Sequence, residues 1–444
     1  MNKTSRKTPI PLLNPKTPVD WWFLFKLNSF EEPGAPKPDQ TNGLFDVKSW
    51  KRPSYETSGK KFSQHYLFAS SRNPELQHGR GILGSMHYDP LGSTFEQVYA
   101  GSYYYVLWND QFYGDPAPSR GAPWGHSKGM LAWNEEGEGL VMQVSTPSWP
   151  ASGSSKYPRQ SDGNTLGYVS DDDIEVSQHF FALKITKDDL VKILTGLKNA
   201  SVVTGISTAS SWNRLMKQKL KDKLVSAPLP PRPDIRQVIN NGGPEDVQKL
   251  VKTLGRREKE GAPLNVLLSS GVRLISKPSS LAVPPWQMVS AELGGIDLRV
   301  ASWWSTPRIY STTRASGKPG CWGGGLGTPG AVDIATTGTW KPPSGHKVEY
   351  LGLTGGLGRN YNHAKFGVST SGSNAYCIFG DMNQQGALCQ GYLTARQKCS
   401  SSQNGRGGLF YVLENETLFK SLTGLLTGES APTAPPSGKK RKQS

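Results

Sequence analysis

The sequence contains few cysteines and no long apolar run. Its four cysteines, Cys321, Cys377, Cys389 and Cys399, lie in the C-terminal third and lack the spacing of a structural zinc site. One or two disulfides are compatible with them if the chain meets an oxidising compartment. No stretch approaches the ~20 apolar residues that a spanning helix needs, and the N-terminus lacks the apolar run of a secretory signal. We therefore expect no membrane segment, and the compartment stays open, secreted or lysosome-like.

Acidic residues are in the minority. The chain has 51 Lys and Arg against 35 Asp and Glu, a formal charge of +16. Such a charge attracts polyanions and speeds their encounter with the protein, and nucleic acid is the first candidate. The alternative is that the charge only aids solubility, because net charge says nothing about fold or chemistry.

The composition favours a mixed α/β (α+β) fold. With 50 Gly and 33 Pro, many turns and short strands are expected, and 35% apolar residues are enough for a globular core. The apolar runs at 18–26 and 103–108 are typical of buried strands. The pattern from Thr186 to Lys198 predicts a helix that Thr186 caps and that has acidic residues in its first turn.

The chain divides into four regions by composition. Residues 1–200 and 264–425 form two halves, and residues 201–263 between them are charged and proline-rich, which favours an insertion or linker. In that segment a solvated surface helix is favoured over a nucleic-acid clamp. Residues 426–444 end in KKRKQS and predict a disordered basic tail, either a nuclear address or only solvated charge.

Two histidine-x-lysine motifs carry the candidate chemistry. His126-Ser127-Lys128 leads into GMLAW, a polar turn and LVMQVS, which predicts a β-hairpin. His363-Ala364-Lys365 leads into FGVS, a polar turn and AYCIFGD, which predicts a second hairpin. Because side chains alternate along a strand, a spacing of two places His and Lys on one side. Two such pairs brought together would surround one phosphodiester with two imidazoles and two ammonium groups.

The spacing by itself is weak evidence. In so basic a chain, chance places a basic residue two positions after some of the seven histidines, and His78-Gly79-Arg80 is a third example. The motifs at His126 and His363 differ from this third example because each is expected to open a hairpin that is followed by polar residues. These are Ser148 after the first hairpin, and Asp381 and Asn383 after the second. Asp381 is a candidate to orient a histidine and Asn383 to bind phosphate, although both also suit a structural turn.

Several segments of the sequence resemble those of a known family. WGHSKGMLAW resembles the first motif of the deoxyribonuclease II family, and YNHAKFGV with YCIFGDMNQQ resembles its second. PVDWWFLFK, VLWNDQ and LRVASWW resemble strands of the same family. The resemblance implies a phospholipase D-like fold, a pseudo-twofold pair of mixed sheets flanked by helices with the site between the two halves.

The resemblance also implies an activity. Members of the family are endonucleases that hydrolyse DNA at acidic pH without a metal or other cofactor. The resemblance therefore implies a phosphohistidine intermediate and products with 3′-phosphate ends. The implied catalytic residues are His126, Lys128, His363 and Lys365, with one histidine as nucleophile and the other as general acid; the order of these two roles stays open. Asp381, Asn383 and Ser148 would support them.

The sequence departs from the family at two positions. Asn134 stands where an acidic residue is usual after the first hairpin strand, and Ser148 stands where the downstream polar turn usually has asparagine. We expect activity to survive both changes, since both side chains remain polar. The alternatives are a phospholipase-like phosphodiesterase acting on another substrate and an inactive nucleic-acid-binding homologue. DNA is the expected partner, no membrane docking is predicted, and homodimer formation stays open.

Overall fold

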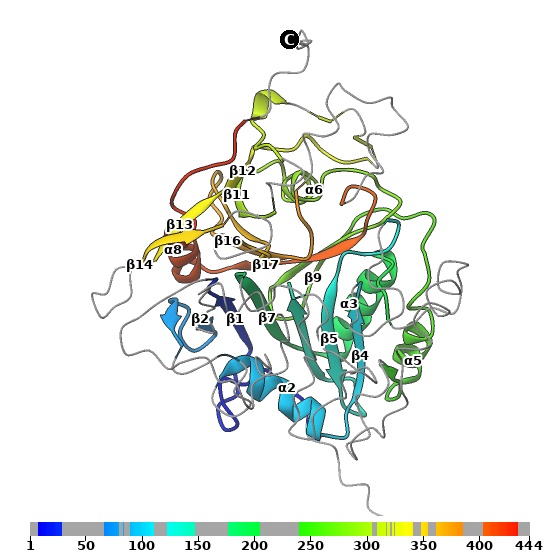
Figure 1. The fold of residues 1–444 in the computed structure, drawn as a ribbon. Helices are drawn as coiled ribbons and strands as arrows, with labels where there is room; N and C mark the ends of the chain where they lie inside the picture. The colour runs from blue at the N-terminus through cyan, green and yellow to red at the C-terminus, as the bar shows by residue number, and fades with distance from the viewer. Residues whose placement is uncertain are drawn as a thin grey trace, which may run out of the picture.

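Two large β-sheets packed face to face form the centre of the molecule (Figure 1). The computed structural model describes residues 8–28, 66–79, 83, 89–110, 122–146, 176–204, 239–303, 309–316, 318–319, 322–323, 325–340, 348–353, 361–384 and 403–433. Everything below refers to these residues. No helix among them is both long and apolar enough to cross a membrane.

The first sheet has eight strands in the order β3-β2-β1-β7-β6-β5-β4-β8. Its strands are β1 (Trp21–Lys26), β2 (Tyr66–Ser70), β3 (Gln77–His78), β4 (Tyr104–Asn109), β5 (Lys128–Trp133), β6 (Gly139–Val144), β7 (Gln178–Ile185) and β8 (Ile239–Asn240). Neighbouring strands in it are all antiparallel. The expectation of a mixed sheet is therefore wrong for the described part of this half. Strand β8 comes from the segment interpreted as an insertion, but it pairs with β4 at the edge of this sheet.

The second sheet has seven strands in the order β12-β11-β15-β16-β17-β10-β9. Its strands are β9 (Leu264–Leu267), β10 (Arg273–Lys277), β11 (Leu298–Ala301), β12 (Val332–Ala335), β15 (Phe366–Ser369), β16 (Tyr376–Gly380) and β17 (Gly408–Glu414). It is mixed, because β11 and β12 run parallel. A separate ribbon joins β13 (Thr337–Trp340) and β14 (Val348–Gly352).

The two sheets repeat one strand order. Reading from one edge, β2-β1-β7-β6-β5-β4-β8 in the first sheet corresponds to β9-β10-β17-β16-β15-β11-β12 in the second. In both, a hairpin, β5–β6 or β15–β16, lies next to the last long strand of its half. A helix follows that last strand in each half: α3 (Lys187–Asn199) after β7 and α8 (Glu416–Leu425) after β17. The chain is thus built from two similarly ordered units, one per sheet.

The core lies mainly between the two sheets. On β1, Trp21, Phe23 and Phe25 face the second sheet, while Trp22 and Leu24 face the other way, as strand alternation requires. Phe379 of the second sheet stacks on both Phe23 and Phe181, with ring centroids 4.8 Å and 4.4 Å apart. Each buried aromatic side chain of this kind contributes about 1.5–3 kcal/mol by leaving water. The halves therefore share one core rather than folding around two separate ones.

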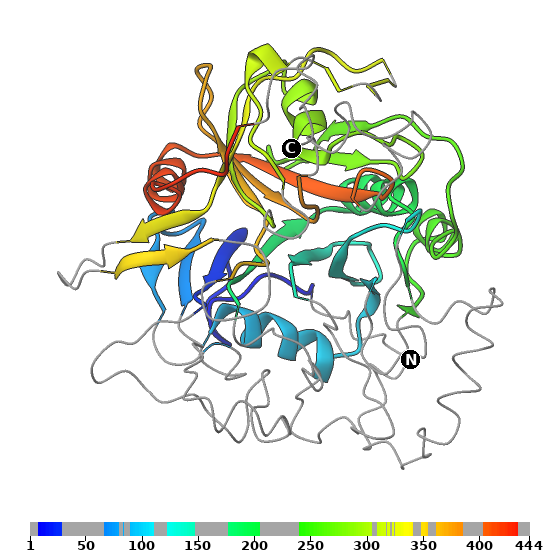
Figure 2. The same ribbon diagram turned by 45° about the horizontal axis from the view of Figure 1, so that its top comes forward.

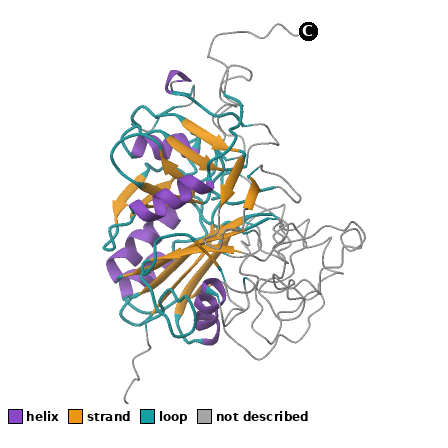
Figure 3. Cartoon of the chain, turned by 90° about the vertical axis from the view of Figure 1, so that its left-hand side faces the viewer, coloured by secondary structure: helices purple, strands orange, loops and turns teal. Residues whose placement is uncertain are grey.

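Helices cover the outer faces of the two sheets (Figures 2 and 3). Helix α2 (Pro90–Ala100) packs on the outer face of the first sheet, and α6 (Pro285–Glu292) packs on that of the second. Helix α3 lies against β10 and β17 of the second sheet and also against α5 (Glu245–Val251). A short 3-10 turn, η3, spans Arg314–Ser316.

Several sequence predictions are confirmed. The helix predicted from Thr186 forms with Thr186 as its N-cap, in a capping box with Asp189. Both predicted hairpins form, and strands occupy the two predicted apolar runs. Cys377 is a buried free thiol, and the other three cysteines lie outside the described residues. The proline-rich stretch before residue 239 and the terminal KKRKQS also lie outside them.

Candidate active site

The first motif precedes strand β5 and touches the second half. Lys128 is the first residue of β5, whereas His126 lies in the segment that leads into it. The amide of His126 donates a hydrogen bond to the carbonyl of Gly407, which precedes β17, at 2.8 Å. A Cβ on Gly125 or Gly407 would lie 2.7 Å or 2.1 Å from the carbonyl oxygen of Ala200. Glycine is required at both positions because the backbones approach so closely.

The second motif makes the matching contact in the opposite direction. His363 precedes β15, and its amide donates to the carbonyl of Ser177, which precedes β7, at 2.8 Å. Each motif is therefore bound by its backbone to the other half, at the same point of the strand order. Since both histidines precede the strands β5 and β15, strand alternation alone does not set the direction of either ring.

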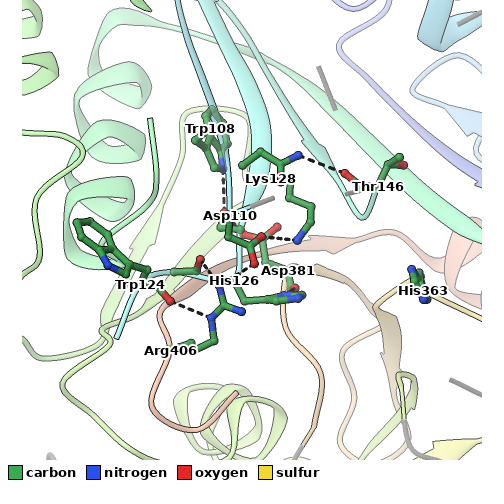
Figure 4. A network of polar contacts seen from close by, with 12 residues as sticks. Trp108, Asp110, Trp124, His126, Lys128, Thr146, His363, Asp381 and Arg406 are labelled. Atoms are coloured by element: carbon green, nitrogen blue, oxygen red, sulfur yellow. Dashed lines mark hydrogen bonds and ion pairs between the residues drawn. The ribbon is translucent and has the colours of Figure 1, made fainter. Parts of the chain in front are cut away.

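The His126 ring is held by the second half (Figure 4). Its Nδ1 lies 2.7 Å from the main-chain oxygen of Asp381. A carbonyl only accepts, so Nδ1 carries the proton and Nε2 keeps its lone pair in the neutral ring. Burial, followed by the charge of Lys128, holds the pKa of His126 well below 6.5; Arg406 and Lys365 act in the same direction, and Asp110 opposes them. Both the burial and the neighbouring cations therefore favour the neutral form of His126.

A buried ion network surrounds this histidine (Figure 4). Lys128 Nζ lies 2.5 Å from Asp110 Oδ1, and Arg406 Nη2 lies 2.7 Å from Asp110 Oδ2. Burial alone would raise the pKa of Asp110, but the two cations outweigh it and hold that pKa below its usual value. Two positive charges share one carboxylate, so the network keeps a net positive charge.

Ser127 links the first motif to the Asp381 side chain. Its hydroxyl donates to Asp381 Oδ2 at 2.5 Å and accepts from the indole N–H of Trp108 at 2.8 Å. The amide of Leu409 donates to the same carboxylate oxygen. Burial raises the pKa of Asp381 to about 7, against these hydrogen bonds. Asp381 therefore contacts His126 through its main-chain oxygen, while its carboxyl group contacts Ser127.

The surroundings of the second motif are less charged. The Lys365 ammonium donates to the carbonyl of His363, and the Lys365 amide donates to Nδ1 of the buried His179 at 3.1 Å. The His363 ring stacks on Trp303, with centroids 4.9 Å apart. Asn383 accepts a hydrogen bond from the Trp303 amide through its side-chain oxygen. Asn383 therefore supports the ring on which His363 rests.

The structure brings the two motifs into one region. The carbonyl of Lys365 accepts from the amide of Gly380 at 2.8 Å, and the next residue, Asp381, holds the His126 ring. The charge of Lys365 is also close enough to lower the pKa of His126. Figure 4 shows His363 in the same close view, outside the dashed network.

Of the two positions that depart from the family pattern, the structure describes only Asn134. Ser148 lies outside the described residues. Strand β5 begins at Lys128, and Asn134 follows its other end. There the Asn134 side-chain oxygen accepts hydrogen bonds from the amides of Glu136 and Glu138 in the hairpin turn. Because Asn134 is a turn residue away from the cluster, its departure from the family pattern does not change the charge of the site.

The sequence interpretation missed four residues of the cluster. Asp110 and Trp108 belong to the quoted run VLWNDQ, so a polar residue just after a buried strand was a usable signal. His179, within β7, and Arg406, before β17, are more than 180 residues away from their partners in the chain. No local pattern marks either of them. Within the described ranges, no group of three or more His, Cys, Asp or Glu side chains is placed to hold a metal ion.

Comparison with known families gives one match. The family model for deoxyribonuclease II matches residues 47–313, more than half of the 444-residue chain. The matched interval contains His126 and Lys128 and ends before His363 and Lys365. No curated protein matches the sequence.

Proposed function

Because the chain belongs to the deoxyribonuclease II family, we propose that it is a metal-independent endonuclease that cuts DNA at acidic pH through a phosphohistidine and leaves 3′-phosphate ends. That it is a hydrolytic deoxyribonuclease follows from the family. The proposal adds the mechanism, the roles of the two histidines and the phospholipase D-like relation between the two halves, which the repeated strand order supports.

The geometry of the His126 ring carries the proposal. A nucleophilic imidazole needs a free lone pair at the working pH, and in acid an ordinary histidine loses it by protonation. The hydrogen bond from Nδ1 to Asp381 leaves Nε2 as the unprotonated nitrogen, and the lowered pKa keeps it so in acid. His126 is therefore the nucleophile. Attack on phosphorus makes its ring cationic, and the Asp381 carbonyl stabilises that charge.

The reaction then takes two steps, formation of the phosphohistidine and its hydrolysis. In the first, Nε2 of His126 forms a bond to phosphorus, the bond from phosphorus to the 5′-oxygen breaks, and His363 gives its proton to that oxygen. In the second, water attacks the phosphohistidine, His363 takes the proton of the water, and the electron pair of the N–P bond returns to Nε2. The product is a 3′-phosphate. A positioned acid such as His363 typically contributes ~10²–10⁴ in rate.

The cations neutralise charge on the phosphate. Lys128 and Lys365 belong to opposite halves and are both close enough to His126 to lower its pKa. Ammonium groups fixed in a buried site stabilise the charge on the non-bridging oxygens without the reorganisation that water would need. The Asn383 side-chain NH₂ is a further donor, because its oxygen is already occupied by Trp303. Side-chain cations thus supply the charge neutralisation that a metal ion supplies elsewhere.

Plasmid digestion across pH in excess EDTA tests this function. We expect cleavage below neutral pH, 3′-phosphate and 5′-hydroxyl ends, and an acid-labile phosphoryl group on His126 after rapid quenching. Cleavage that stops in EDTA and returns with a divalent cation would contradict metal independence. Ends with 5′-phosphate would contradict the proposed direction of attack.

The two alternatives are separated by substrate and by variants. A lipid phosphodiesterase would hydrolyse phosphatidylcholine and leave plasmid DNA intact. An inactive binding homologue would bind DNA in a salt-sensitive way with no cleavage at any pH. For the proposed enzyme, His126→Ala or His363→Ala removes cleavage while salt-sensitive binding remains. Undiminished cutting by both variants would show that the site lies elsewhere.

A further inference from the structure

Arg406 comes from the second half but its side chain lies on the first motif. Its Nη2 donates to Asp110 Oδ2 at 2.7 Å and to the carbonyl of Gly125 at 2.9 Å, and its Nε donates to the carbonyl of Trp124 at 2.9 Å. Gly125 directly precedes His126 in the chain. The guanidinium is thus fixed beside the proposed nucleophile, and its charge is one of those that lower the pKa of His126.

The backbone of Arg406 is held as firmly as its side chain. The buried ammonium of Lys277 donates to the carbonyls of Asn404 and Arg406, both at 2.8 Å. The next residue, Gly407, lies so close to Ala200 that no side chain fits there. A donor held in this way loses little conformational entropy when it binds a ligand, which is the condition for preorganised charge stabilisation.

The contacts of Arg406 leave donors and charge unused. A guanidinium carries five N–H donors, of which Nε and Nη2 supply the three that are occupied. Nη1 makes no hydrogen bond or ion pair to any residue that the structure describes. Asp110 divides its single negative charge between Arg406 and Lys128, so these three side chains together carry a net positive charge. An anion at this position would complete the network.

We propose that Arg406 is a third phosphate-binding cation of the site and donates from Nη1 to a non-bridging oxygen of the scissile phosphodiester. The inference rests on the proposed function, since it names a further residue for the same reaction. Arginine suits this role because its planar fork holds the carboxylate of Asp110 on one side and presents further N–H groups on another. A lysine in its place would keep the charge but lose the fork.

The test combines DNA cleavage with the binding of inorganic phosphate. Arg406→Gln removes the charge, Arg406→Lys keeps it, and Arg314→Gln is the matched control, because Arg314 is 61% exposed and pairs with Asp297 outside the cluster. We expect Arg406→Gln to lower kcat/KM on DNA, and to weaken phosphate binding measured by calorimetry at acidic pH, each by about 10- to 100-fold, the loss of one charge-assisted hydrogen bond. Arg406→Lys should fall in between, and Arg314→Gln should match the wild type.

If Arg406→Gln folds poorly, Arg406→Lys takes its place, because it keeps a cation beside the buried Asp110 carboxylate. Its cleavage and phosphate affinity should then fall below those of the wild type. Free guanidinium ion added to Arg406→Ala should restore part of the cleavage rate. If folded Arg406→Gln keeps wild-type cleavage and phosphate affinity, Arg406 only joins the halves and the inference is overturned. If the wild type itself neither cleaves DNA nor binds phosphate, the proposed function fails instead.

Discussion

The two His-x-Lys motifs occupy the same place in two similarly ordered sheets, and their surroundings differ. Around the first, Lys128 is paired with Asp110, Asp110 with Arg406, and Ser127 with Asp381. At the second, Ala364 stands in the place of Ser127 and packs in the apolar core. Lys365 binds backbone and the ring of His363 rests on Trp303.

A repeated backbone does not give equal chemistry. The Asp381 carbonyl selects one tautomer of His126, and burial with the neighbouring cations lowers its pKa, which suits the proposed nucleophile. The His363 ring is stacked on an indole outside the ion network, and the proposed function gives it the role of proton donor.

Replacing each histidine on two substrates separates the two roles. On DNA, His126→Ala should lose about 10⁴-fold or more in rate and His363→Ala about 10²–10⁴-fold. On bis(4-nitrophenyl) phosphate, whose leaving group needs no proton, His363→Ala should release the first equivalent of 4-nitrophenol at close to the wild-type rate, and His126→Ala should not. Steady-state assays on DNA and burst measurements on the aryl ester, both at acidic pH, measure the two effects. If only His126→Ala recovered its rate on this aryl ester, His363 would be the nucleophile and His126 the general acid.

Removing the shared carboxylate should destabilise the fold. Asp110→Asn leaves two buried cations without their anion, and breaking a buried pair in this way costs roughly 3–5 kcal/mol. Urea denaturation at neutral pH measures the free energy of unfolding. The control is Glu416→Gln, which breaks an exposed pair with Lys420 and should change that energy by only a few tenths of a kcal/mol. Equal effects of the two changes would mean that the buried network contributes no more than a surface pair.

Asp381 should make the folded state less stable as pH rises. Its folded pKa of about 7 lies above the ordinary 3.8, so between these values the folded protein binds the proton more tightly than the unfolded chain. The resulting stability is complete below about pH 4 and is lost as pH rises through about 7, by up to roughly 4 kcal/mol. Asp381→Asn should remove this slope. Parallel curves of unfolding free energy against pH for the two proteins would contradict the shift.

His179 should support the second motif through its ring nitrogen Nδ1, which accepts a hydrogen bond from the Lys365 amide. Asparagine places a side-chain oxygen close to where Nδ1 of His179 accepts from the Lys365 amide, whereas leucine offers no acceptor. His179→Leu should lower kcat/KM on DNA about tenfold, the worth of one hydrogen bond, and His179→Asn should restore much of the loss. Equal activity of the two variants would show that only the volume of the ring matters.

Local sequence patterns predicted much of the fold. The capped helix from Thr186 and both hairpins follow from periodicity and turn residues, which depend on near neighbours in the chain. The first sheet was expected to be mixed and is antiparallel in its described strands, because strand direction depends on which strands meet, and sequence spacing does not specify that. For the same reason the sequence did not indicate that β8, in the segment interpreted as an insertion or linker, pairs with β4 in the first sheet.

For the candidate site, local sequence patterns alone indicated the two histidines and two lysines, their place at the mouths of two hairpins, and the phosphate chemistry that these side chains favour. The groups that hold the His126 ring and lower its pKa are known only from the tertiary structure. Asp110 and Arg406 are 296 positions apart in the chain and share a buried ion pair. Pairing and burial of charge come from segments that meet only when the two sheets pack, and these contacts set the protonation of His126.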